Sequence, residues 1–176
     1  MHLSASGVRS APVALGLVSL LAVLPATSSA AAAPRLSPEG FGPVHFGMNI
    51  HQAEAALGDP IEVDPGINGC SFWTLPGDLS GTAFGGRLGY ILLSEPGPRT
   101  TRNIEVGDGL ARLRHRYRGR LHKGRSASLG AADLRLFNSE SGGGAVYELE
   151  FNIVGGKVAF ISAGTRHTIE TFGECA

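Results

Sequence analysis

Residues 44–58, VHFGMNIHQAEAALG, carry the pattern that decides the fold. Their order predicts a short strand over 44–46, a glycine turn, and an amphipathic helix whose N-cap is Asn49, because an asparagine side chain can accept from the free amides of a first helical turn. Gly58 suits the left-handed residue that ends a helix. The helix has an apolar stripe at positions i, i+3 and i+7, formed by Ile50, Ala53 and Leu57.

A second copy of this pattern begins at residue 104. Gly107 follows Gly47 by 60 residues, and we predict Asp108 as the second N-cap and Gly119 as the end of the second helix. The same offset places Val106, Leu110, Leu113 and Tyr117 on Phe46, Ile50, Ala53 and Leu57. The glycine pairs 85–86 and 155–156 match at an offset of 70. Two matching segments, each aligned on its glycines and in the same order along the chain, indicate an internal duplication.

Each copy continues into strands and turns. The expected strands cover 61–63, 71–75, 82–84, 87–94, 104–106, 133–137, 145–154 and 157–164, with a loop over 138–144 and a tail over 165–176. We therefore predict an α+β fold of two duplicated strand–helix–β-hairpin units, with the helices packed on one face of an antiparallel sheet. We expect the two repeats to span 33–99 and 100–176 and to form one compact domain together.

Residues 1–32 have the features of a secretory signal peptide. Arg9 precedes an apolar run over 11–24, and small residues follow it. The run is shorter than the roughly 20 residues that a membrane-spanning helix needs. Cleavage after Ala30 or Ala32 fits the small residues, and no cysteine lies there to carry a lipid anchor. We therefore expect a secreted, extracellular protein whose mature form has no membrane span.

The composition is that of a turn-rich, weakly charged chain. It has 26 glycines, and its 15 Lys and Arg balance its 15 Asp and Glu, so the net charge argues neither for nor against a polyanionic partner. The two cysteines are Cys70 and Cys175. In a secreted chain an even number of cysteines favours pairing, so we expect one disulfide that ties the C-terminal tail to the first repeat.

The motif Phe46-Gly47-Met48, followed by a helix and Gly58, resembles a known bacterial repeat. It is similar to the tandem-repeat module of the β-lactamase inhibitory proteins and of the small outer-membrane assembly lipoproteins of the SmpA/OmlA type. The resemblance covers 44–94 and 104–164. It implies helices on one face of an antiparallel sheet and a non-catalytic function, the binding or inhibition of another protein. This chain differs in having one cysteine per half.

The densest charge feature is a run of cations with no acid between them, formed by Arg112, Arg114, Arg116, Arg118, Arg120, Lys123 and Arg125. It lies on and after the second predicted helix, on both sides of its apolar stripe. Such a run can bind a phosphate-rich polymer or an acidic protein surface. The alternative is a solvated helix neutralised by acids from elsewhere, namely Glu148, Glu150, Glu170 and Glu174. Nucleic acid is not an expected partner of a secreted chain with this net charge.

Residues 145–154 alternate cleanly in polarity. Tyr147, Leu149, Phe151 and Ile153 are expected to face the helices, which leaves Glu148 and Glu150 together on the opposite face. Paired carboxylates can serve glycoside hydrolysis, but catalytic pairs flank a cleft from separate elements. We therefore expect these two glutamates to lie on an open, wet sheet surface.

Chemical motifs are otherwise missing from the sequence. The histidines, His45, His51, His115, His122 and His167 after the signal peptide, lack a tight metal-ligand spacing, and there is no G-x-S-x-G or phosphate-binding glycine pattern. We predict no catalytic residue, metal or cofactor. The aromatic residues singled out as interface candidates are Phe72, Trp73, Tyr90 and Phe137. For Trp73 a core position and an interface position both remain open.

The favoured function is therefore a secreted, non-catalytic binding protein that recognises or inhibits another extracellular or envelope protein. Two alternatives remain, a small secreted hydrolase and an envelope protein that binds anionic wall polymers through its basic helix. The candidate binding residues are Trp73, Tyr90, Arg112, Arg114, Arg116, Arg118, Arg120, Phe137, Glu148 and Glu150.

Overall fold

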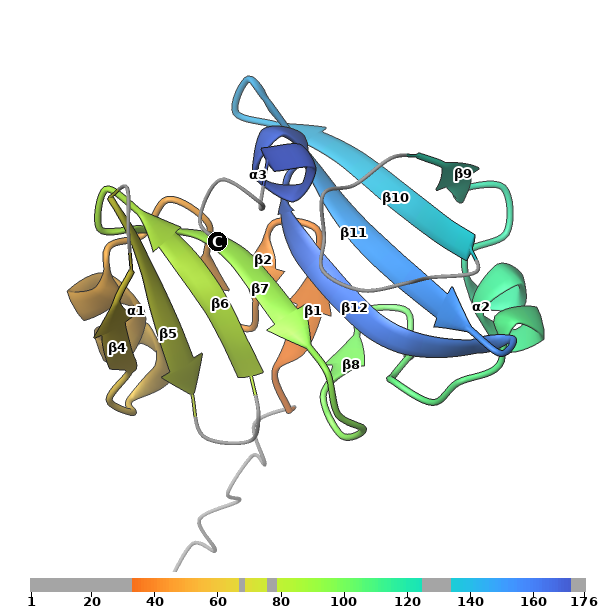
Figure 1. Cartoon of the computed structure of the whole chain (residues 1–176), viewed down its shortest axis with the longest axis horizontal. Helices are drawn as coiled ribbons and strands as arrows, with labels where there is room; N and C mark the ends of the chain where they lie inside the picture. The colour runs from red at the N-terminus through yellow and green to blue at the C-terminus, as the bar shows by residue number, and fades with distance from the viewer. Residues whose placement is uncertain (1–32, 67–68, 76–78, 125–133, 172–176) are drawn as a thin grey trace, which may run out of the picture. The chain divides into compact units, whose positions relative to one another are not determined.

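The computed structural model describes residues 33–66, 69–75, 79–124 and 134–171. Strands hold 51% and helices 17% of these residues, so the protein is mostly β. The described chain forms an eight-stranded sheet, a four-stranded sheet and three short helices (Figure 1). The expectation of an α+β fold with helices packed on one face of a sheet is therefore wrong.

The eight-stranded sheet is antiparallel throughout, in the order β4-β5-β6-β7-β12-β11-β10-β9. Its strands are β4 (Glu62–Pro65), β5 (Cys70–Leu75), β6 (Leu79–Phe84), β7 (Arg87–Leu93), β9 (His122–Lys123), β10 (Leu134–Gly142), β11 (Ala145–Val154) and β12 (Lys157–Thr165). The four-stranded sheet has the order β3-β2-β1-β8, and β1 and β8 are parallel. Its strands are β1 (Arg35–Ser37), β2 (Gly40–Phe41), β3 (Val44–His45) and β8 (Arg99–Thr100).

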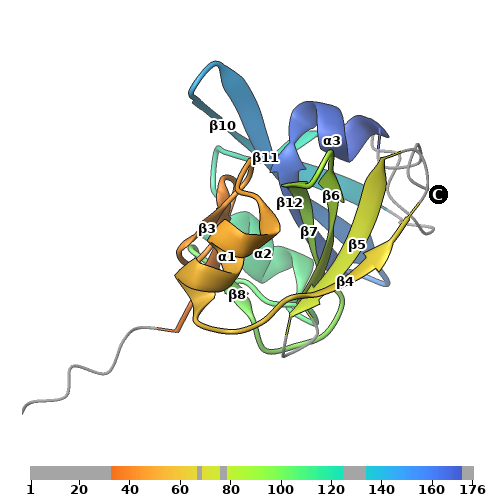
Figure 2. The ribbon, with the colours of Figure 1, turned by 90° about the vertical axis from the view of Figure 1, so that its left-hand side faces the viewer.

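The helices are too short to cover a sheet by themselves. They are α1 (Ile50–Leu57), α2 (Leu110–Arg116) and α3 (Arg166–Thr171). Within α1 only Ala53 is buried, and within α2 only Leu113. The small sheet and the loops supply the rest of the cover through Leu36, Val44 and Ile104. Figure 2 shows α1, α2 and the small sheet on one side of the eight-stranded sheet, while α3 lies on the other.

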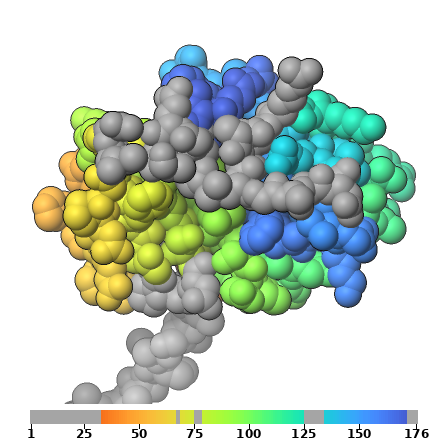
Figure 3. Space-filling model, viewed as in Figure 1, coloured from red at the N-terminus to blue at the C-terminus, as the bar shows by residue number. Residues whose placement is uncertain are grey.

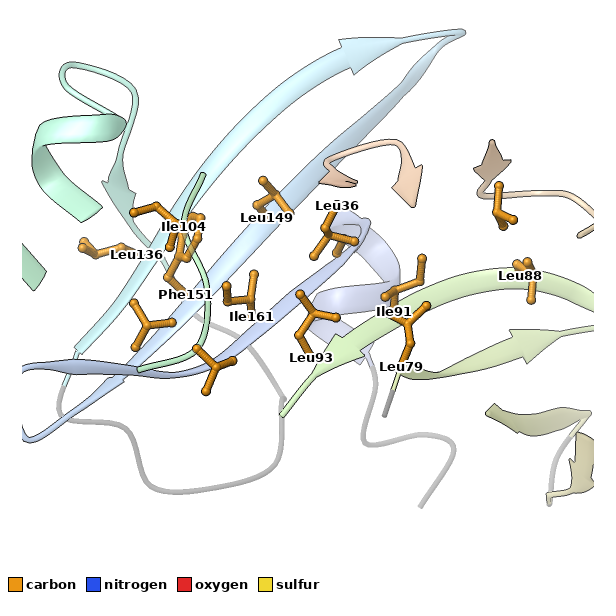
Figure 4. Close-up of a cluster of buried hydrophobic side chains, with 14 of the residues drawn as sticks. Leu36, Leu79, Leu88, Ile91, Leu93, Ile104, Leu136, Leu149, Phe151 and Ile161 are labelled. Atoms are coloured by element: carbon orange, nitrogen blue, oxygen red, sulfur yellow. The ribbon is translucent and has the colours of Figure 1, made fainter. Parts of the chain in front are cut away.

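The main hydrophobic core lies between the eight-stranded sheet and this cover. On β11 the alternation is as the sequence predicts, because Leu149, Phe151 and Ile153 all belong to this core. The core is continuous between the two halves of the chain, as Figure 4 shows for Ile91 and Ile161. Burial of alternate strand residues against one shared layer therefore holds the two halves together.

The two halves make the same backbone hydrogen bonds. The Gly47 N–H donates to the Leu88 carbonyl (2.7 Å), and the Leu88 N–H donates to the Met48 carbonyl (2.8 Å). In the second half the Gly107 N–H donates to the Val158 carbonyl (2.8 Å) and the Val158 N–H to the Asp108 carbonyl (2.9 Å). The offsets are again 60 and 70 residues. Gly47 and Gly107 have φ of 90° and 93°, which L side chains rarely adopt, so glycine is required at this turn.

The sheet repeats the same symmetry. The β6–β7 pair has a register shift between Thr82 and Ala83, and the β11–β12 pair has one at the residues 70 positions later, Asn152 and Ile153. The two four-stranded halves join through β7 and β12, where Leu92 faces Ser162, its own counterpart at that offset. A pseudo-two-fold axis therefore passes through the Leu92–Ser162 pair.

Several local expectations were wrong. The N-cap of α2 is Gly109, because the Asp108 carboxylate instead accepts from the Glu105 amide (3.1 Å) and pairs with Arg112 (3.2 Å). Residues 104–106 form no strand, and residues 138–142 continue β10 because they pair with β11 up to its tip. The tail is helical over α3, where the Thr165 hydroxyl accepts from the Thr168 amide (3.1 Å) and so acts as an N-cap.

Replacing Asn49 with alanine should destabilise the protein by about 1 kcal/mol, the usual effect of losing an N-cap side chain. The Asn49 carboxamide oxygen accepts from the Gln52 amide (2.9 Å), and the Gln52 side chain accepts from the Asn49 amide (3.0 Å). Chemical denaturation measures the difference. Asn49→Asp keeps the acceptor and should keep the wild-type stability; equal loss in both variants would show that the cap is not the cause.

Candidate functional site

Trp73 lies in the main core. Trp73 is 1% exposed. Of the two positions that the sequence left open, core and interface, the structure therefore shows the core position. The register pairs it with Gly81 on β6, where the absence of a side chain leaves room for the indole ring. Trp73 therefore offers no surface to a partner in this conformation.

Tyr90 and Phe137 are also buried, at 2% and 1% exposure, on the opposite face of the eight-stranded sheet. They form a small second cluster with Ile169 of α3. Burial raises the pKa of Tyr90 to about 12; the Ser162 hydroxyl opposes this rise, and the nearby Glu150 carboxylate adds to it. These two aromatic residues fasten α3 to the sheet and are not exposed anchors.

Glu148 and Glu150 are 3% and 0% exposed, so the expectation of a wet sheet face is wrong. Strand alternation does place both on the face away from the main core, but α3 packs there against β11, β12 and β7. Arg135 Nε lies 3.5 Å from Glu150 Oε1, and Arg166 Nε lies 2.9 Å from Glu148 Oε1. The two carboxylates are therefore paired separately with arginines, as buried charges must be.

A cavity of about 290 Å³ next to Glu148 is the best candidate for catalysis. It is lined by His122, Gly124, Phe137, Glu148, Arg166 and Glu170, from β9, β10, β11 and α3 among other segments. Ser139 Oγ donates to Glu148 Oε1 (2.8 Å) and lies 3.4 Å from His122 Nε2. A serine hydrolase needs its carboxylate on the other ring nitrogen, yet Glu148 also approaches Nε2, at 3.9 Å. This geometry is that of an ion-pair network.

Metal ligation finds no support either. Within the ranges that the structure describes, no group of three or more His, Cys, Asp and Glu side chains could hold a metal ion. Another cavity, of about 360 Å³, has Phe46, Phe84 and Tyr147 in its lining, with Phe46 and Tyr147 stacked at 6.3 Å between ring centroids. It was not foreseen from the sequence, because its lining comes from both halves and from α3.

The arginine run is the part of the predicted site that is accessible. Arg112, Arg114, Arg116, Arg118 and Arg120 are all exposed. Arg112 pairs with Asp108, which gives that residue a structural role. Arg114 and Arg116 lie in the last turn of α2, where cations favourably meet the negative end of the helix dipole. The dipole does not account for Arg118 and Arg120, which follow the helix.

Two of the four acids that were expected to neutralise this run are engaged elsewhere. Glu148 pairs with Arg166 and Glu150 with Arg135. Glu170 lies on α3 and lines the cavity beside Glu148. The fourth acid, Glu174, lies outside the described residues. The neutralised-helix alternative is therefore wrong for Glu148 and Glu150.

A groove of about 340 Å³ runs beside the arginine-rich helix, and we call it the basic groove. It is lined by Arg114, Tyr117, Arg118, Gly119, Leu121, His122, Lys123 and Leu136. Tyr117 is held in place by an edge-on contact with Phe151 (5.0 Å between centroids) and by Arg102 over its ring (5.5 Å). The lining contains the cations Arg114, Arg118 and Lys123, which we call the basic rim, and His122. It also contains Tyr117, Leu121 and Leu136, which we call the apolar floor.

The predicted disulfide remains a prediction. Cys70 is buried at the start of β5, and the described part of the chain has no free cysteine. Its expected partner, Cys175, lies outside the described residues, and so do the segment predicted as a signal peptide and the last five residues of the tail.

No family model, curated protein or solved structure matches this chain. Among the helices of the described ranges, none is both long and apolar enough to cross a membrane. The basic groove is therefore the main structural indication of function.

Proposed function

We propose that this chain is a secreted, non-catalytic binding protein, and that its basic groove holds an acidic surface of another extracellular or envelope protein. One observation carries the proposal: the groove has a rim formed by Arg114, Arg118 and Lys123, and two of the glutamates expected to neutralise it, Glu148 and Glu150, pair with other arginines. Exposed cations around one groove give an attractive field for an anionic partner.

The floor of the groove favours a protein over an anionic wall polymer. Leu121 is partly exposed and gives it apolar surface between the cations, whereas Tyr117 and Leu136 are 1% and 6% exposed. An acidic protein segment can place an apolar side chain on that floor, whereas a polymer of phosphates has no group that gains from it.

The test is capture of partners on the immobilised protein from culture medium and from envelope extracts. The double variant Arg114→Glu/Arg118→Glu should weaken binding of the captured protein at least about tenfold, because it places like charges in contact. Lys157→Glu is the matched control, since this exposed cation lies at the β11–β12 turn, and it should leave binding unchanged. Circular dichroism checks that each variant is folded.

The alternative results are equally clear. Binding that the double reversal leaves intact would place the site elsewhere on the molecule. Capture of purified anionic wall polymer with the same loss in the double variant, and no protein captured at any salt concentration, would replace the proposal by the polymer-binding alternative.

A further inference from the structure

Two equivalent segments of the two halves carry net charges of opposite sign. Residues 110–124 contain six Lys and Arg and no acid. Their counterparts at the offset of 60, residues 50–64, contain four acids and no Lys or Arg. The repeat therefore kept its backbone pattern while its charge was inverted.

Four acids lie on and after α1, in the segment equivalent to the one that carries the cations of the basic groove: Glu54, Asp59, Glu62 and Asp64. We call this segment the acidic edge. Glu62 pairs with Thr74 of β5 as His122 pairs with Phe137 of β10, so the residues at offset 60 occupy equivalent places in the sheet. Asp59, Glu62 and Asp64 are exposed, and the Glu54 side chain is 30% exposed.

These two surfaces lie at opposite ends of the eight-stranded sheet. β4 is one edge strand and β9 is the other. Figure 3 shows the orange-to-yellow segment that contains the acidic edge and the green-to-cyan segment that contains α2 on opposite sides of the view. Because eight strands alternate in direction, β4 of a second copy placed beside β9 in the same orientation would continue the antiparallel order.

We propose that copies of this chain associate head to tail, with the acidic edge of one copy against the basic groove of the next. Two acidic edges repel each other, as do two basic grooves, so charge selects the unlike pair and disfavours a two-fold dimer. Exposed edge strands commonly pair with strands of other molecules, and charged side chains on them usually prevent this. Here β4 and β9 carry charges of opposite sign, so repulsion prevents β4–β4 and β9–β9 pairing but not β4–β9 pairing. The inference rests on the proposed function, since an acidic protein partner and a second copy compete for one groove.

Sedimentation of the purified protein tests the association. The weight-average mass should rise with protein concentration at about 20 mM salt and fall to that of the monomer at about 0.5 M salt, where exposed charges are screened within a few ångströms. Arg114→Glu/Arg118→Glu and Glu62→Lys/Asp64→Lys should each stay monomeric at both salt concentrations. Mixing these two variants should restore association, because each reversed surface then meets a complementary one.

Two results would overturn the inference: a wild-type protein that stays monomeric up to about 0.5 mM at low salt, or association that survives both double reversals. Partner capture is then measured with Glu62→Lys/Asp64→Lys, whose basic groove is intact. A monomeric wild type with normal capture leaves the proposed function standing and removes self-association. If Arg114→Glu/Arg118→Glu abolishes self-association but not partner capture, self-association stands and the proposed function is removed.

Discussion

Replacing Gly81 with alanine is expected to destabilise the fold by about 3 kcal/mol or more, the upper part of the range for overpacked cores. A Cβ atom at this position would lie 2.6 Å from Trp73 Cε2 and still closer to Trp73 Cζ2 and the Tyr90 carbonyl oxygen. The indole ring is 1% exposed, and the carbonyl belongs to the neighbouring strand β7, so neither can move away without disturbing the sheet. Equilibrium unfolding in urea measures the loss.

Gly142→Ala is the matched control for this substitution. Its new Cβ would meet only flexible groups, with Glu39 Oε1 nearest at 2.9 Å, and Gly142 lies in a strand as Gly81 does. We expect its stability to change by less than about 0.5 kcal/mol, as at most surface positions. If Gly81→Ala unfolded at the same urea concentration as the control, the packing of Trp73 over β6 would be wrong.

Alkaline pH should unfold the protein through two buried tyrosines. Burial raises the pKa of Tyr90 and of Tyr117 to about 12, against an ordinary value of 10.0. Below pH 10 both hydroxyls keep their protons in the folded and the unfolded chain. Above pH 10 the unfolded chain releases protons that the folded chain retains, so stability falls until about pH 12. A shift of two units corresponds to about 2.7 kcal/mol for each tyrosine, or roughly 5 kcal/mol together.

The measurement is the free energy of unfolding between pH 8 and 12, followed by far-UV circular dichroism. Tyr90→Phe and Tyr117→Phe should each remove about half of the fall in stability, and the double variant most of it. Tyrosinate absorbance reports the ionisation directly and should rise together with unfolding. Ionisation of both tyrosines near pH 10 in a chain that stays folded would contradict the burial of these hydroxyls.

Local pattern predicted the repeated backbone. The helix over 50–57 begins and ends where Asn49 and Gly58 indicate, because both residues act on the adjacent turn alone. The hairpin glycine pairs 85–86 and 155–156 have positive φ and lie between the expected strands. The matching hydrogen bonds of Gly47 and Gly107 then follow from the same offsets that the sequence shows.

Local pattern did not predict which elements cover each face of the eight-stranded sheet. Alternation on β11 gives the face on which Glu148 lies, but not that α3 covers that face. The sequence contains an N-cap for α3, Thr165, followed by Thr168 and the apolar Ile169. This pattern covers too few residues to predict a helix. The β1–β8 pairing joins residues about 64 apart, Arg35 and Arg99, and two-residue strands leave almost no periodicity to read. The α+β expectation failed for these reasons.

The candidate site also has features that the local sequence predicts and features that depend on the tertiary structure. The arginine run was visible because charge needs no tertiary information. Its neutralisation by Glu148 and Glu150 was not, since that depends on which cations the fold brings to them. The groove itself required Leu136, from a strand of the sheet, to lie beside Tyr117 and Leu121.

The Leu92–Ser162 pair has a consequence for the history of the chain. It is the position at which each half of the sheet meets its own equivalent, so the β7–β12 junction has the geometry of an isologous dimer interface. A single ancestral half could have paired with a second molecule of itself across this strand, and gene fusion would then have made the dimer covalent. Once fused, the two halves no longer had to be identical, and their outer ends were free to acquire opposite charge.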